Sequence, residues 1–161
     1  VIAMDGRAAA GKTTLAEELA VTLGGAVVHM DDFFLPGELR TPERLAAPGG
    51  NVHAERFAEE VLPYLRRGEA FRYRRFDCHR MDYNGWVEIP TVPVIIVEGA
   101  YSQYPQFGHY ADLTVFCDIA PEEQKRRITV RNGEEHWMVF REQWIPLEAE
   151  YHIKENAMLT V

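Results

Sequence analysis

A short stretch near the start of the chain, GRAAAGKT at residues 6–13, limits most strongly what this sequence can fold into. Its two glycines stand five positions apart, and a lysine and a hydroxyl residue follow directly, which is the spacing of a loop that cradles phosphates. Gly6 and Gly11 allow backbone conformations that other residues rarely adopt, so main-chain N–H groups can approach an anion closely. An apolar run, VIAM, precedes the loop, and a helical pattern over 12–24 follows it. A strand, this loop and a helix in succession predict a site for a nucleoside triphosphate.

The residue types in the loop also predict how the triphosphate is held. Lys12 offers an ammonium group to the β- and γ-phosphates, and Thr13 offers a hydroxyl to Mg²⁺. The N-terminus of the following helix directs a partial positive charge at the same anion. We therefore expect ATP and Mg²⁺ as cofactors and Lys12 as a catalytic group. The residues expected to contact the nucleotide are Gly6, Arg7, Ala8, Ala9, Ala10, Gly11, Lys12, Thr13 and Thr14.

Composition narrows the class of protein. With 161 residues, of which 47% are hydrophobic and 26% charged, the chain is expected to form a single domain over 1–161 with a sizeable core. A formal net charge of −8 argues against nucleic acid or an anionic membrane as a partner. No apolar stretch approaches membrane-spanning length, and Cys78 and Cys117 lie in separate segments without metal-ligand spacing. We expect a cytoplasmic protein that acts on a small molecule. The sequence leaves open whether it forms a homo-oligomer.

Strand-like and helix-like patterns alternate along the chain, which predicts an α/β fold with a mainly parallel sheet flanked by helices. The five expected strands cover 1–4, 26–30, 91–99, 112–119 and 157–161. The expected helices cover 12–24, 54–68 and 121–133, and Pro63 should kink or restart the second one. A small β-hairpin is expected over 71–89, with its tight turn at Asn84 and Gly85. With the phosphate loop, these elements predict the P-loop nucleoside triphosphate hydrolase fold.

Acidic residues follow two of the expected strands. Ligands of an open parallel sheet lie beyond the carboxyl ends of its strands. Glu98 ends an apolar strand, and Gly99 lets the chain turn away, so Glu98 is expected to reach Mg²⁺. Asp31 and Asp32 end the second strand, where a carboxylate would take the proton from an acceptor hydroxyl. We expect Asp31 to be this base and Asp32 to be solvated.

Basic residues crowd the helix expected at 121–133. Arg127 and Arg131 stand one turn apart on the same face. One interpretation is a solvated basic face with a Glu123–Arg127 pair. In an acidic protein with a phosphate loop, we favour a lid whose Arg127 and Arg131 cover the transferring phosphoryl group.

Two further groups of residues are assigned structural roles. A stripe at spacings of three and four is expected to pack in the core, and it consists of Trp137, Phe140, Trp144, Leu147 and Tyr151. Four scattered histidines are expected to be structural or exposed, at positions 29, 109, 136 and 152.

Taken together, these residues resemble the phosphoribulokinase/uridine kinase family of P-loop kinases, especially its short bacterial uridine kinase-like members. The resemblance covers nearly the whole chain and rests on the segments GRAAAGKTT, MDDFFLP, GGNVHAERF, FDCH, VIIVEGAY and KRRITVRNG. It implies that Asp31 is the catalytic base, that Glu98 serves the metal, and that Arg127 and Arg131 belong to the lid. The acceptor site implied by the resemblance consists of Asp31, Phe33, His53, Asp77, His79 and Tyr101.

One position departs from the family pattern. Uridine kinases place an aspartate where this chain has His53, and a neutral imidazole cannot accept hydrogen bonds from two ribose hydroxyls as a carboxylate does. We therefore expect uridine and cytidine to be poor acceptors. An anionic group on the acceptor would suit His53, together with Arg56 or Arg80.

The resulting hypothesis is an ATP-dependent kinase that phosphorylates a hydroxyl of a small metabolite. A nucleoside of the uridine or cytidine type is the first candidate acceptor, and a pantothenate- or sugar-phosphate-type acceptor is the alternative. A nucleotide-dependent binding or regulatory protein without transfer activity is the alternative from another class.

Overall fold

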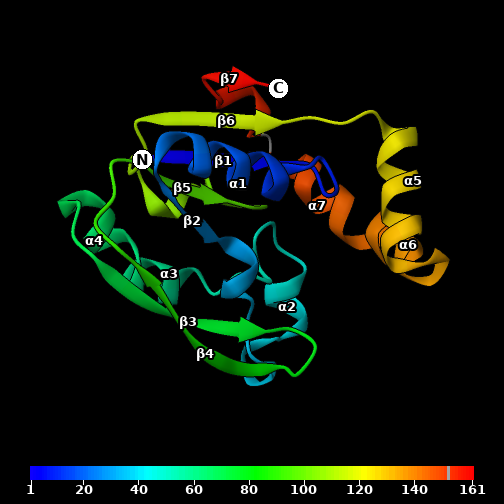
Figure 1. The fold of residues 1–161 in the computed structure, drawn as a ribbon. Coiled ribbons are helices and arrows are strands. Elements are labelled where there is room, and N and C mark those ends of the chain that lie inside the picture. The colour runs from blue at the N-terminus through cyan, green and yellow to red at the C-terminus, as the bar shows by residue number, and fades with distance from the viewer. Residues whose placement is uncertain (152) are drawn as a thin grey trace.

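The sheet predicted from the sequence is present. The structure, a computed structural model, describes residues 1–151 and 153–161, so the expectation for His152 lies outside the described residues. Five strands pair in the order β2-β5-β1-β6-β7, and each of the four pairings is parallel (Figure 1). The strands are β1 (Ile2–Gly6), β2 (Ala26–His29), β5 (Ile95–Glu98), β6 (Leu113–Cys117) and β7 (Leu159–Thr160).

Successive strand residues point to opposite faces, and this divides the core in two. Met4 packs with helix α1 (Lys12–Leu23), which covers one face through Ala16 and Ala20. Ala3, one residue earlier, belongs to a larger cluster on the other face. That cluster is rich in aromatic rings and contains Phe33, Phe57, Phe71, Tyr73, Tyr101, Phe107 and Tyr110.

The chain between β2 and the hairpin forms short elements. A 3₁₀ turn at Met30–Phe33 follows β2 directly, and further short helices are a 3₁₀ turn at Gly37–Leu39 and α2 (Pro42–Leu45). The helix expected at 54–68 is interrupted, giving α3 (Ala54–Glu60) and α4 (Leu62–Arg67). Pro63 has no N–H to donate to the preceding turn, so a new helix begins beside it, and it lies in the first turn of α4. The predicted restart at Pro63 is thus confirmed.

The hairpin lies within the predicted range, but its turn does not lie at Asn84 and Gly85. Strands β3 (Phe71–Asp77) and β4 (Asp82–Ile89) are antiparallel and are connected by 78–81. The register shifts so that Arg75 of β3 opposes both Asn84 and Gly85 of β4, and Gly85 has a φ of 81°. The glycine therefore serves a β-bulge, which needs the same positive φ as a tight turn.

Residues 121–150 form helices beside the carboxyl end of the sheet (Figure 1). Helix α5 (Pro121–Asn132) matches the predicted lid helix, and α6 (Glu134–Val139), a π-helical turn (Phe140–Trp144) and α7 (Ile145–Glu150) follow. The two remaining short turns are 3₁₀ segments at Pro105–Phe107 and Lys154–Asn156. The aromatic stripe is only partly buried, and Phe140 and Trp144 line a cleft, so the prediction that they pack in the core is wrong.

Candidate active site

The phosphate loop joins β1 to α1, and close packing demands its first glycine. Gly6 has a φ of 143°, and a Cβ atom there would lie 2.1 Å from the carbonyl oxygen of Cys117 in β6. Gly11 has a φ of 89° and immediately precedes α1. Both glycines thus occupy conformations that side chains would obstruct or strain.

Lys12 and Arg7 have different positions in this loop. The Lys12 ammonium is buried and donates to the carbonyl oxygens of Gly6 and Arg7 at 2.8 and 2.9 Å. The Arg7 guanidinium instead donates to the carbonyl of Ile119 at 2.7 Å and to Gln124 Oε1 at 2.6 Å. Arg7 therefore connects the phosphate loop to the start of α5 through hydrogen bonds. Its side chain does not line the cleft.

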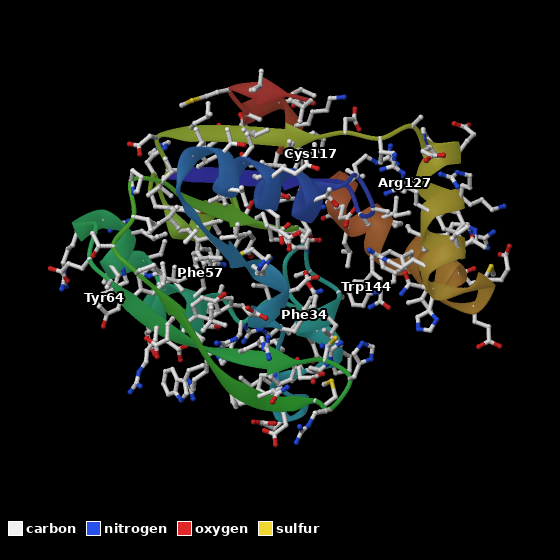
Figure 2. The ribbon with its side chains drawn as sticks, in the orientation of Figure 1. Phe34, Phe57, Tyr64, Cys117, Arg127 and Trp144 are labelled. Carbon is white, nitrogen blue, oxygen red and sulfur yellow. The ribbon has the colours of Figure 1, made fainter. Side chains whose placement is uncertain are left out.

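A cleft of about 640 Å³ opens beside the loop. The predicted site residues that line it are Ala8, Ala9, Ala10, Gly11, Lys12, Thr13, Thr14, Asp31, Glu98, Tyr101, Arg127 and Arg131. Lining residues that sequence reasoning missed are Met30, Phe34, Arg40, Asn51, Val52, Cys78, Met81, Gly99, Ala100, Phe140, Trp144 and Glu148. Figure 2 shows Arg127, Trp144 and Phe34 around the same end of the sheet.

The side chains that would hold Mg²⁺ lie together. Thr13 Oγ1 lies 3.2 and 3.3 Å from the two carboxylate oxygens of Glu98, which is only 4% exposed. His29 Nδ1 lies 2.6 Å from Glu98 Oε1, and this hydrogen bond raises the pKa of His29. His29 is therefore part of the site, a role that its isolated position in the sequence did not indicate.

A hydroxyl and a carboxylate are oxygen ligands that suit Mg²⁺. Within 1–151 and 153–161, no group of three or more His, Cys, Asp or Glu side chains could hold a metal. Mg²⁺ commonly keeps several waters and binds through one or two carboxylates plus substrate phosphates. The pair Thr13 and Glu98 fits this mode of binding.

The two aspartates after β2 have different surroundings. Asp31 lines the cleft; partial loss of hydration there raises its pKa, and the negative charge of Glu98 raises it further. Asp32 Oδ2 accepts a hydrogen bond from the Tyr73 hydroxyl at 2.9 Å, and its main-chain oxygen accepts one from Arg56. Asp32 is thus bound to the hairpin and α3, and the expectation that it is solvated is wrong.

Phe33 does not reach the cleft. Its ring is 0% exposed, and the Arg56 guanidinium lies 4.2 Å from the ring centroid. The 3₁₀ turn directs Phe33 into the core, whereas the next residue, Phe34, lines the cleft. Phe34 therefore takes the place in the cleft that was expected for Phe33.

The hairpin turn contributes different residues from those expected. Asp77 Oδ1 accepts hydrogen bonds from the backbone N–H groups of His79 and Arg80 at 2.9 and 3.3 Å, which stabilises the turn. Neither Asp77 nor His79 lines the cleft. Cys78 and Met81 of the same turn do.

His53 also lies outside the cleft lining. Its Nδ1 is buried and has no hydrogen-bond partner in the described part of the chain. Burial lowers the pKa of His53, and the positive charge of Arg56 lowers it further. Arg56 is itself 2% exposed and donates to Glu60 Oε2 at 3.3 Å. The expectation that a protonated His53 meets an anionic acceptor with Arg56 or Arg80 is therefore wrong.

Helix α5 presents its arginines in two directions. Arg127 Nη1 donates to the phosphate-loop carbonyl of Ala9 at 3.1 Å, while its Nε donates to Glu123 at 2.8 Å. Arg126 also binds Glu123 and does not line the cleft, whereas Arg131 does. The Glu123–Arg127 pair expected for a solvated basic face is present. The Arg127 guanidinium also reaches the phosphate loop, as expected for a lid.

Glu148 of α7 is the most unexpected residue in the cleft. Its Oε2 accepts a hydrogen bond from the backbone N–H of Ala8 at 3.1 Å, and burial raises its pKa to about 6. Phe140, Trp144 and Glu148 recur every four residues, so they were detectable as one helical face. The sequence does not indicate which surface that face contacts.

Comparison with solved structures identifies the fold. A possible uridine kinase from Bacillus stearothermophilus matches with a TM-score of 0.67 and 18% identity, over 99% of this chain and 86% of that chain. A candidate fructose transport system kinase from Silicibacter sp. TM1040 matches with a TM-score of 0.75 and 24% identity, over 99% of this chain and 88% of that chain. The fold is that of the P-loop kinases.

The predicted resemblance is thereby confirmed at the level of the P-loop kinase fold. No protein-family profile matches the chain. Among the helices of the described residues, none is both long and apolar enough to span a membrane.

Proposed function

We propose that this chain is an ATP-dependent kinase that transfers the γ-phosphoryl group of ATP to a hydroxyl of a small metabolite. One observation carries the proposal: Asp31 lines the same cleft as the phosphate loop and the Thr13–Glu98 pair. A base for an acceptor hydroxyl and the groups that hold a triphosphate and its metal thus share one space.

In this mechanism, backbone N–H groups of the phosphate loop and the Lys12 ammonium would hold the triphosphate, and Thr13 and Glu98 would hold Mg²⁺. A metal ion held by these two residues would supply positive charge against the phosphates. Asp31 orients the acceptor hydroxyl and accepts its proton while the hydroxyl oxygen attacks the γ-phosphorus. A new O–P bond forms as the bond between the γ-phosphorus and the β–γ bridging oxygen breaks, and ADP leaves with that electron pair. The proton on Asp31 then passes to water.

The lid arginines complete this arrangement. Arg127 contacts the loop at Ala9, and Arg131 lines the cleft one turn further along α5. Their guanidinium groups would stabilise the charge that spreads over the transferring phosphoryl group. Closure over the acceptor would also exclude water and limit wasteful hydrolysis.

The resemblance favours a nucleoside of the uridine or cytidine type as acceptor, with a pantothenate- or sugar-phosphate-type acceptor as the alternative. A nucleotide-dependent regulatory protein without transfer activity is the candidate from another class, because it would need the same phosphate loop and no acceptor. ATP turnover with and without a panel of hydroxylated acceptors tests both. Strong stimulation by one acceptor class supports the kinase, and turnover that ignores every acceptor supports the regulatory protein.

A further inference from the structure

The segment 34–52 forms one wall of the cleft as a loop that is closed at its base. Phe34 and Val52 form an antiparallel β-bridge, and the Leu35 N–H donates to the carbonyl of Asn51 at 3.0 Å. The base of the loop immediately follows the turn that carries Asp31. Residues of this loop that line the cleft therefore lie where an acceptor held by Asp31 would extend. They are Phe34, Arg40, Asn51 and Val52.

Arg40 is the cation of this wall. None of the ion pairs within the described residues involves Arg40, and its side chain donates no hydrogen bond there. Its neighbour Arg44 differs, because it donates to Glu55 at 2.7 Å and to the carbonyl of Val52 at 3.3 Å. Arg40 thus presents a guanidinium to the cleft, whereas Arg44 is committed to holding the loop.

The acidic side chains of the cleft are engaged elsewhere. Glu98 contacts Thr13 and His29, and Glu148 accepts from the N–H of Ala8. Asp31 serves as the base in the proposed mechanism. Within the part of the chain that the structure describes, no carboxylate forms an ion pair with Arg40.

The other cations of the cleft lie by the phosphate loop or on the lid. Lys12 donates to loop carbonyls, Arg127 donates to Ala9, and Arg131 stands one turn further along the same helix. These three would face the charge of the triphosphate. Arg40 belongs instead to the loop 34–52, which also contributes an amide, Asn51, and two apolar side chains to the cleft lining.

We propose that the acceptor carries an anionic group, either a carboxylate or a phosphate, and that Arg40 binds it. A guanidinium offers two parallel N–H donors to such a group, and the Asn51 side-chain amide supplies a further donor on the same wall. A neutral acceptor would cover Arg40 and leave its donors without partners, which disfavours binding. This inference rests on the proposed kinase function and names the acceptor class for that site.

The test compares hydroxylated compounds in pairs that differ by one anionic group. Pantothenyl alcohol with pantothenate and glycerol with glycerate examine a carboxylate, and D-ribose with D-ribose 5-phosphate examines a phosphate. In the wild type, kcat/KM for the anionic member of at least one pair should exceed that of its neutral partner at least tenfold. Arg40→Gln should bring that ratio close to one by raising KM, and Arg40→Lys should restore part of it. Arg72→Gln is the matched control, because Arg72 is exposed on the hairpin and stacks on Trp86.

Several kinetic outcomes would overturn the inference. A wild-type ratio near one or below it in every pair would do so, as would a preference that survives Arg40→Gln. An equal fall in kcat for both members would show that Arg40 acts on the transferring phosphoryl group instead of the acceptor.

A binding measurement separates this inference from the kinase proposal. Cys78 lines the cleft and is exposed, whereas Cys117 is buried, so a maleimide should alkylate Cys78 selectively. At least one of the three anionic compounds should slow this alkylation in the wild type and not in Arg40→Gln. Protection without phosphorylation of any acceptor would overturn the kinase and leave the anion site standing. Phosphorylation of neutral compounds without protection by any anionic one would overturn the anion site alone, and the absence of both would overturn the two proposals together.

Discussion

Glu148 Oε2 lies 3.1 Å from the backbone nitrogen of Ala8, so an acidic side chain occupies a donor of the phosphate loop. The two residues are 140 positions apart, and α7 brings them together. A carboxylate at this position repels a triphosphate when it is ionised and ceases to do so when it is protonated. The charge on Glu148 therefore opposes nucleotide binding in a manner that depends on pH.

Glu148→Gln should tighten ATP·Mg²⁺ binding at pH 7.5. Removing a unit charge a few Å from an anion changes the interaction energy by ~1 kcal/mol in a largely aqueous setting, or about fivefold in Kd. Because burial raises the pKa of Glu148 to about 6, the wild-type carboxyl group becomes neutral below that pH. The difference in Kd between wild type and variant should therefore shrink from pH 7.5 to pH 5.5. Titration calorimetry of both proteins measures it.

The matched control for this change is Glu150→Gln. Glu150 lies on the same helix and is exposed, so its loss should leave the Kd for ATP·Mg²⁺ nearly unchanged. A Glu148→Gln protein that binds ATP more weakly than the wild type would show that the carboxylate supports the nucleotide site.

Asp31→Asn should lower kcat by ~10²–10⁴-fold, which is the usual range for removing a general base. Binding of ATP·Mg²⁺ should persist, because Thr13 and Glu98 remain. Asp32→Asn should act on stability instead, by ~1 kcal/mol, because Asp32 accepts from the Tyr73 hydroxyl. Single-turnover kinetics and chemical denaturation of both variants separate the two effects. A larger kinetic loss in Asp32→Asn would assign the base to the neighbouring residue.

The pH dependence of transfer should report the raised pKa of Asp31. The base works only when ionised, so kcat/KM should fall as pH drops, with a midpoint above the ordinary value of 3.8. Stability should follow the opposite trend. A folded-state pKa above the unfolded one means that ionisation destabilises the fold at higher pH, so Asp31→Asn should gain melting temperature relative to wild type between pH 4 and pH 7. A constant difference in melting temperature over that range would show that the pKa of Asp31 is not raised.

Lys12→Ala should reduce transfer by ~10²–10³-fold, because the ammonium meets charge that develops in the transition state. The variant also loses two hydrogen bonds to loop carbonyls, so circular dichroism must establish that it folds. Lys125→Ala is the control, since Lys125 is exposed on α5 and approaches Trp137. A folded Lys12→Ala protein with nearly normal turnover would refute the assignment of this loop as a phosphate site.

Sequence reasoning predicted the features that local chemistry determines. The phosphate loop, the five parallel strands and the restart at Pro63 each depend on a few neighbouring residues whose backbone requirements are restrictive. The apolar run before Glu98 likewise becomes a fully buried strand. Such local patterns leave little choice of conformation, which explains why they were predictable.

The failures lie where one local signal permits two structures. A glycine with positive φ serves a tight turn or a bulge equally well, and Gly85 serves the bulge. A 3₁₀ turn instead of a continued strand decides which of Phe33 and Phe34 enters the core. Arg40 and Glu148 were missed for another reason: their roles depend on which distant segments they face, and the sequence pattern of a single segment carries no such information.

The bridge between Phe34 and Val52 closes the loop 34–52 at its base, so this loop can be replaced without changing the sheet. Everything between these two residues begins and ends at one point of the scaffold, so its length can change at a small entropic cost, ~0.6 kcal/mol for each doubling. Replacing the loop would change Arg40 and Asn51. Asp31, Glu98 and the phosphate loop would keep their places at the carboxyl end of the parallel sheet. Grafting the corresponding loop from a kinase of different preference is therefore a direct route to a new acceptor, and a natural lineage could diversify its substrates by the same means.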